Sequence, residues 1–104
     1  MLITTTDTIP GRDVTGTLGL VSGNVVRARA VGRDIVAAVR NLTGGDVKEY
    51  RELLTQSRAD AVAKMAEEAA ALGADAIVGM RFATAEVMQG TAEILAYGTA
   101  VKLA

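Results

Sequence analysis

GGDVKEYRELLTQSRADAVAKMAEEAAALG, residues 44–73, is the stretch that decides the fold. Its helix signals agree with one another. Asp46 is a good N-cap residue, and Glu49, three positions later, has the side chain that completes a capping box. Gly73 suits the left-handed conformation that ends many helices, and no proline or glycine interrupts residues 47–72. The sequence therefore predicts one long helix over residues 47–72.

The apolar residues of this helix recur at helical spacing, which indicates an amphipathic helix packed on a sheet. The expected stripe consists of Val47, Tyr50, Leu54, Ala61, Met65, Ala69 and Leu72, with Val62 at its flank. On the opposite side Asp60 and Lys64 are one turn apart, and we expect them to pair. Alanines supply much of the remaining helix surface, and such small side chains let a second backbone approach closely.

The length of this helix favours self-association. Its residues would form a rod of roughly 39 Å at the usual rise per residue. A compact chain of this size has a diameter of about 33 Å if it is treated as a sphere. The helix would therefore overhang its own domain.

The composition describes one domain, residues 1–104, with a thin core. Half of the residues are apolar, but there is no Trp, one Phe and two Tyr. Packing must therefore rely on aliphatic side chains and Met. We expect such a core to need cover from neighbouring copies.

Charge and cysteine content exclude several classes of function. The chain has 11 basic and 12 acidic residues, a net charge of −1 and no block of like charge, so a dedicated nucleic-acid partner is not expected. No Cys is present, which excludes disulfides and thiol chemistry. The N-terminus lacks the pattern of a signal peptide, and no apolar run is long enough for a membrane span. We expect no membrane partner and a cytoplasmic location.

The flanking segments read as strands and one shorter helix. Residues 2–6 are expected to form a short strand, and Pro10-Gly11 the turn that follows it. Residues 13–29 resemble a long strand, in which three glycines indicate bulges or the close approach of another backbone. A shorter helix is predicted from Gly32 to the hinge at Gly44-Gly45. Residues 74–85 and 91–103 read as two strands joined by a turn at residues 88–90.

The last two predicted strands are apolar on both faces. In the first, strict alternation would place Val78, Met80 and Phe82 on one face and Ile77 and Ala83 on the other. In the second, Leu95, Tyr97 and Val101 alternate with Ile94, Ala96 and Ala100. One helix layer covers only one face of an antiparallel sheet. The second face is therefore expected to meet another subunit.

The order of motifs along the chain resembles the YbjQ-like family. The resemblance is carried by Ile9-Pro10-Gly11, Gly32-Arg33-Asp34-Ile35, Arg40-Asn41-Leu42-Thr43-Gly44-Gly45, Gly73-Ala74-Asp75-Ala76-Ile77-Val78-Gly79 and Tyr97-Gly98-Thr99. It covers essentially the whole chain. The resemblance implies an α+β subunit similar to dodecin subunits, with a two-layer antiparallel β-sheet, one long and one shorter helix on one face, assembled as a homopentameric ring. The family is functionally uncharacterised and is customarily labelled as heavy-metal-binding.

The residues of this chain do not match that label. Soft and borderline metals favour thiolate and imidazole ligands, and the chain contains no Cys and no His. Met65 and Met80 fall on expected core faces, where they act as packing residues. We predict no cofactor and assign no metal ligand.

Eight polar residues are candidates for a ligand site or for subunit contacts: Arg33, Asp34, Arg40, Asn41, Arg81, Glu86, Glu93 and Tyr97. A charge in the middle of a strand, such as Arg81, needs a partner, and Glu93 is the expected one. No catalytic residue is assigned. The leading interpretation is a non-enzymatic homo-oligomeric binding or scaffold protein, with a small-molecule or ion site at subunit junctions. The alternatives are a protein of metal homeostasis and an enzyme with an inter-subunit site built from carboxylates and Arg81.

Overall fold

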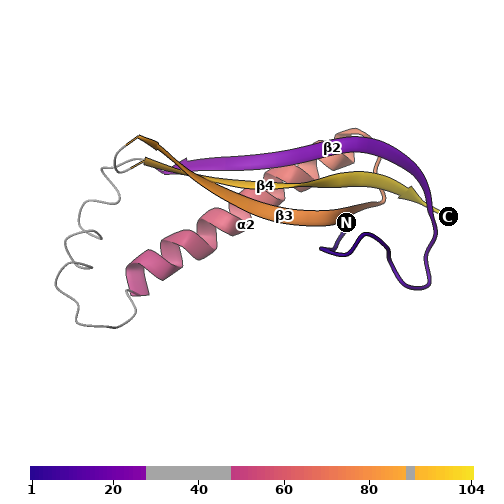
Figure 1. Cartoon of the computed structure of the whole chain (residues 1–104), viewed down its shortest axis with the longest axis horizontal. Coiled ribbons are helices and arrows are strands. Elements are labelled where there is room, and N and C mark those ends of the chain that lie inside the picture. Colours follow the sequence, from indigo (N-terminus) through magenta and orange to yellow (C-terminus); the bar gives the residue numbers. More distant parts are fainter. Residues whose placement is uncertain (28–47, 89–90) are drawn as a thin grey trace.

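The structure, a computed structural model, describes residues 1–27, 48–88 and 91–104. These residues form β1 (Leu2–Ile3), β2 (Val14–Arg27), α2 (Lys48–Ala71), β3 (Ala76–Met88) and β4 (Thr91–Leu103). The strands make one sheet in the order β1-β3-β4-β2, and α2 crosses one face of it (Figure 1). This confirms the α+β class and the long helix. The predicted shorter helix and the predicted cap at Asp46 lie outside the described residues.

The sheet is mixed, which corrects the prediction of a purely antiparallel one. β4 pairs antiparallel with both β2 and β3, as expected, but β1 pairs parallel with β3 through Leu2 and Ile3. The apolar pattern at residues 2–6 indicated an extended segment but carried no information on the direction of a partner more than seventy residues away. The strand is also shorter than predicted.

A bulge in β3 reverses the predicted facing of its residues. Val78 lies opposite Thr99 and Arg81 opposite Tyr97, so three steps along β3 match two along β4. Gly79, between them, has a φ of 62°, a left-handed conformation that glycine adopts at no steric cost. As a result Ile77 and Met80 both face the helix, whereas Val78 faces away from it. The prediction that Val78 and Met80 share a face was wrong.

The core lies between α2 and the sheet. It contains Ala61, Met65 and Ala69 from the helix, packed on buried residues that the three long strands supply: Val21, Val25, Ile77, Met80, Ile94, Ala96 and Ala100. Ala61, Met65 and Ala69 confirm the centre of the predicted stripe. Leu72 does not belong to it, because the chain leaves the helix at that point and the side chain is 48% exposed.

The polar contacts of α2 differ from the predicted pair of Asp60 with Lys64. Asp60 instead pairs with Arg27 at 3.1 Å, while Lys64 donates to the backbone carbonyl of Asn24 at 3.3 Å. Arg27 also donates to the hydroxyl of Ser57, which is fully buried. Both helix residues therefore bind β2 and not each other.

The end of α2 is closed in the predicted way at Gly73. Its φ is 79°, and the N–H groups of Gly73 and Ala74 donate to the carbonyls of Ala70 and Ala69. This is the Schellman arrangement, which satisfies carbonyls that the last helical turn leaves without partners.

We call the sheet face away from α2 the open face. A strap, residues 4–13, covers one end of it, where Ile9 packs against the cluster of Ala76, Val78 and Val101. The rest is open among the described residues: Leu20 is 73% exposed, Val26 51% and Tyr97 36%. Cross-strand pairing places these residues on the same side as Thr99 and Glu93.

The shape of the chain is elongated. β3 continues beyond Met80 as an arm, residues 81–88, in which every residue is exposed. The radius of gyration is 16.8 Å, whereas a compact chain of this length has about 13 Å. The arm and the open face thus have little cover from the described residues.

Candidate binding site

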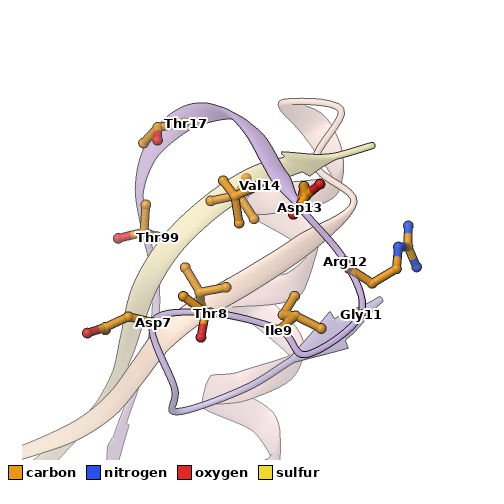
Figure 2. A pocket seen from close by; sticks show the side chains of 11 residues that line it. Asp7, Thr8, Ile9, Gly11, Arg12, Asp13, Val14, Thr17 and Thr99 are labelled. Carbon is orange, nitrogen blue, oxygen red and sulfur yellow. The ribbon is translucent and has the colours of Figure 1, made fainter.

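A pocket of about 600 Å³ lies between the strap and the open face (Figure 2). The strap provides one wall, the start of β2 a second, and β3 and β4 the floor. The residues that line it are Asp7, Thr8, Ile9, Gly11, Arg12, Asp13, Val14, Thr17, Val78, Thr99 and Val101. We call it the strap pocket.

Hydrogen bonds attach the strap firmly to the sheet. Thr4 donates from its N–H to the carbonyl of Ile77 and accepts from the N–H of Met80, and Thr6 accepts from the N–H of Gly79. At the other end, the carbonyl of Asp13 accepts from the N–H of Ala104 at 2.9 Å. Because both ends are attached, the wall of the pocket is built before any ligand arrives.

Irregular backbone is concentrated around this pocket. β2 shifts its register between Val14 and Gly16 and again between Thr17 and Gly19, and β3 does so at the Gly79 bulge. These are three of the four register shifts in the described strands; the fourth lies between Glu86 and Met88, near the end of β3. Bulges redirect side chains and are common beside functional sites. Here the bulge at Gly79 turns Val78 into the floor.

The lining combines two carboxylates, three threonines and an apolar floor. Asp7 and Asp13 are exposed, and neither has a side-chain partner among the described residues, whose ion pairs engage Asp60 and Asp75. Figure 2 shows Arg12 extending away from the other labelled side chains. The lining therefore combines acidic, hydroxylic and aliphatic groups with one guanidinium, that of Arg12.

Asp75 lies beyond the pocket, at the start of β3, and holds the end of β4. Its carboxylate accepts from the N–H of Leu103 at 2.9 Å and pairs with Lys102 at 3.5 Å. The backbone hydrogen bond from Leu103 lowers the pKa of Asp75 below its ordinary 3.8, against a smaller opposing effect of burial and with help from the charges of Lys102 and Arg12. The charge of Arg12 thus acts on Asp75.

Two of the residues singled out in the sequence, Arg81 and Tyr97, lie opposite each other on the open face next to the pocket. Arg81 donates from Nη1 to the carbonyls of Thr5 and Met80, each at 2.8 Å. It therefore fastens the strap to β3. Tyr97 is partly exposed two residues from Thr99, which lines the pocket.

The other singled-out residues lie elsewhere. Glu93 accepts a hydrogen bond from Asn24 at 2.9 Å, and the register places it opposite Ala85, four residues from the partner of Arg81. The predicted ion pair of Arg81 with Glu93 is therefore wrong. Glu86 is in the arm and faces the helix side, because it pairs with Ala92. Arg33, Asp34, Arg40 and Asn41 lie outside the described residues.

Sequence reasoning missed the polar lining of the strap pocket. Asp7 and Asp13 flank the Pro10-Gly11 turn, which was recognised only as a turn. Thr17 and Thr99 occupy strand positions that carry no motif. The pocket exists because the strap folds back over strands far away in the sequence, and no local pattern encodes that contact.

The donor groups of the chain do not suit a heavy metal. Cys and His are absent from the sequence, Met65 is fully buried in the core and Met80 nearly so. Among residues 1–27, 48–88 and 91–104 no three carboxylates are grouped in a way that could hold a metal ion. Carboxylates and hydroxyls alone favour hard cations over soft ones.

Within residues 1–27, 48–88 and 91–104 the chain is a small α+β protein with one helix on a four-stranded mixed sheet. The whole chain, residues 1–104, matches the YbjQ family, which is described as "Putative heavy-metal-binding", and the chain belongs to that family. A UPF0145 protein of Halobacterium salinarum is 53% identical over the full length of both chains. One of Thermotoga maritima is 54% identical over 99% of this chain and 97% of its own.

A solved structure supports the fold. It comes from Pediococcus pentosaceus and is described as a protein of unknown function of the DUF74 family. It covers 100% of this chain and 98% of its own, with a TM-score of 0.66 and 20% sequence identity. Within the described residues, no helix combines the length and the hydropathy that a bilayer crossing requires.

Proposed function

We propose that this chain acts as a homo-oligomeric binding or scaffold protein, a ring of identical subunits that holds a small ligand beside the subunit junctions. Five subunits are expected from the family resemblance. The similarity to dodecin subunits stays a prediction.

One observation carries the proposal: the uncovered apolar surface of the open face. Leu20, Val26 and Tyr97 share this face and are substantially exposed. The arm adds Val87, 59% exposed, and Met88, 65%, whereas Phe82, 43% exposed, pairs with Ala96 and lies on the helix side. Large apolar side chains exposed together on one face of a sheet support an interaction site in a protein that functions in water. A second copy of the chain supplies matching apolar surface.

The family description suggests metal binding as another function, but this chain lacks the ligands for it. Its only sulfur donors are four methionines. Two of them are in the core, Met65 fully buried and Met80 7% exposed, and reach no open site. We therefore derive no function through a heavy metal.

An enzyme with an inter-subunit site would use a carboxylate such as Glu86 or Glu93 together with Arg81. Within one subunit Arg81 is bound to two backbone carbonyls, and Glu86 and Glu93 are on opposite sides of the sheet. Within one subunit these positions give no reason to prefer catalysis over binding.

Native mass spectrometry and light scattering on the full chain test the proposal. We expect a mass that is an integer multiple of the 10.7 kDa subunit, five under the family expectation, and no stoichiometric zinc, copper or cadmium. A folded protein with the mass of one chain at micromolar concentration would overturn the proposal. A metal ion bound at one per subunit would overturn its rejection of the metal function.

A further inference from the structure

We propose that the subunits join edge to edge, so that the sheet of one chain continues into the sheet of the next. The outer edge of β2, residues 20–27, pairs in parallel with the outer edge of the arm, residues 81–88, of a second copy. The inference rests on the proposed function and names the surface through which its subunits associate.

These two edges have no backbone partner among residues 1–27, 48–88 and 91–104. The strand order β1-β3-β4-β2 gives β2 a neighbour on one side only. At the other end of the sheet, β1 and the strap bond to β3 as far as the N–H of Met80, and only β4 pairs with the arm beyond it. Peptide groups on such an edge offer donors and acceptors to an added strand. The described sheet thus ends in two stretches of equal length that can each accept one.

Neither edge carries the usual protection against strand addition. Natural edge strands avoid one another through Lys or Pro residues, bulges or a short length. Residues 20–27 and 81–88 contain no Lys and no Pro. The register shifts of β2 come before residue 20, and the arm has one shift, near its end. Most of both edges is therefore regular enough to form a ladder.

Apolar exposure is concentrated on these same edges. The three most exposed large apolar side chains of the described residues are Leu20, 73%, Met88, 65%, and Val87, 59%. Val26, also on the edge of β2, is 51% exposed, whereas Tyr97 on the inner strand β4 is 36% exposed. A strand added at either edge would lie about 5 Å away and would remove apolar area from water. An identical chain brings one such edge to the other.

The direction of the pairing follows from the symmetry of a ring. β2 and β3 both run antiparallel to β4 and hence parallel to each other. Rotation about an axis close to the strands keeps their direction, so β2 of one copy meets the arm of the next in parallel. An antiparallel contact would require half a turn between copies and would close with only two of them.

The charges on the two edges agree with the parallel direction. Arg27 and Glu86 both lie opposite Ala92, on the helix side of the sheet. Parallel pairing brings these opposite charges to the same end of the contact, where they attract each other. Antiparallel pairing would bring Arg27 to the end that carries Arg81.

Disulfide trapping tests the inference, because the chain contains no Cys of its own. Ala83→Cys is combined with Ser22→Cys or with Asn24→Cys, which covers two registers in which these open-face positions lie side by side. Within one chain Asn24 and Ala83 both lie opposite Leu95, two strand spacings or about 10 Å apart, beyond the reach of a disulfide. Under mild oxidation we expect one of these double variants to form linked chains of more than two subunits.

Ser22→Cys with Thr84→Cys is the matched control, because Thr84 lies opposite the buried Ile94 and faces the helix side. It should form no linked chains. Three results would overturn the inference: no linked chains in either test variant, equal linking in the control, or linking by Ser22→Cys alone, which would show that β2 pairs with β2.

Light scattering on the reduced variants separates this inference from the proposed function. An oligomer that forms no linked chains contradicts only the edge pairing. Linked chains without an upper limit of length contradict only the closed ring, and a monomer contradicts both proposals.

Discussion

Gly23 sets the distance between the helix and the sheet. It is buried in β2 opposite Ala96, and a Cβ atom at this position would collide with the backbone of Ala61 and Met65. Ala61 and Met65 are fully buried at this contact. A residue larger than alanine at position 61 would push the helix away from the sheet. The helix therefore packs against the backbone of β2 itself.

Gly23→Ala is expected to destabilise the protein by about 1–3 kcal/mol, the usual cost of overpacking a core, since backbone atoms cannot turn aside as a side chain can. Denaturant unfolding followed by circular dichroism measures the change. Gly16→Ala is the control in the same strand, where the new Cβ would meet only Lys102 at 3.8 Å. Equal stability of Gly23→Ala and the wild type would show that the helix does not pack on this backbone.

Asp75 makes the junction of β3 and β4 sensitive to acid. Its pKa is lowered in the folded state, so the carboxylate contributes stability that is complete above the ordinary value of 3.8 and is lost as the pH falls through the lower folded value. Asp75→Asn should therefore reduce the melting temperature at neutral pH and leave a smaller difference from the wild type in strong acid. Melting curves between neutral pH and about pH 2 test this. A difference that stays constant over this range would exclude a role for the charge.

At the scale of the element, the Gly79 bulge shows which features of a strand a local sequence pattern can predict and which it cannot. The C-terminal end of α2 and both ends of β4 follow from Gly73 and from alternation, and they agree with the sequence prediction within one residue. The facing of β3 does not follow, because one extra residue reverses the alternation. A glycine in an apolar strand indicates that a bulge is possible. It does not indicate which of the residues around the glycine then switch to the other face of the sheet.

Gly79→Ala is expected to cost about 1–2 kcal/mol, because a Cβ atom is strained in the left-handed conformation. Gly79→Asn should cost roughly half of that, since Asn tolerates this region better. The new Cβ would lie 3.5 Å from Asp7 Oδ1, an ordinary contact, so backbone strain and not crowding is measured. Thermal denaturation of the two variants gives the comparison. Equal loss in both would point to crowding in place of strain.

The candidate site is less predictable than the fold for the same reason. Arg81 and Tyr97 stood out as polar residues in apolar strands, and both lie on the open face beside the pocket. Asp7 and Asp13 did not stand out, because carboxylates beside a Pro-Gly turn are ordinary. Their meaning depends on the strap lying over Val78 and Val101, a contact between distant parts of the sequence.

For the whole molecule, the important feature is that the two faces of the sheet differ in how much of their surface is covered by the described residues. The helix side is closed by Ala61, Met65 and Ala69, whereas the strap covers only one end of the other side. The chain extends 53 Å in one direction and only 16 Å in another, and the described residues leave the arm and most of the open face without cover. In the proposed ring, an identical chain would cover this face in every copy at once.

The combined change Leu20→Lys and Val26→Lys is expected to separate the subunits without unfolding them. Both side chains are more than half exposed in a single chain, so lysine is tolerated there, but a desolvated lysine in a subunit contact is costly. We expect association to weaken at least about tenfold, measured as the concentration at which light scattering reports half-dissociation.

Leu72→Lys is the control for this change, because Leu72 is 48% exposed at the end of the helix and away from the open face. It should leave the assembly intact. Dissociation by Leu72→Lys alone would place the subunit contact on the helix layer, and an unchanged mass for the double variant would show that the open face is not part of the contact.

Circular dichroism of the separated double variant then decides whether the chain folds before it associates. A retained spectrum means that the sheet and helix form first and that the open face is a docking surface, since Leu20 and Val26 do not belong to the core of the single chain.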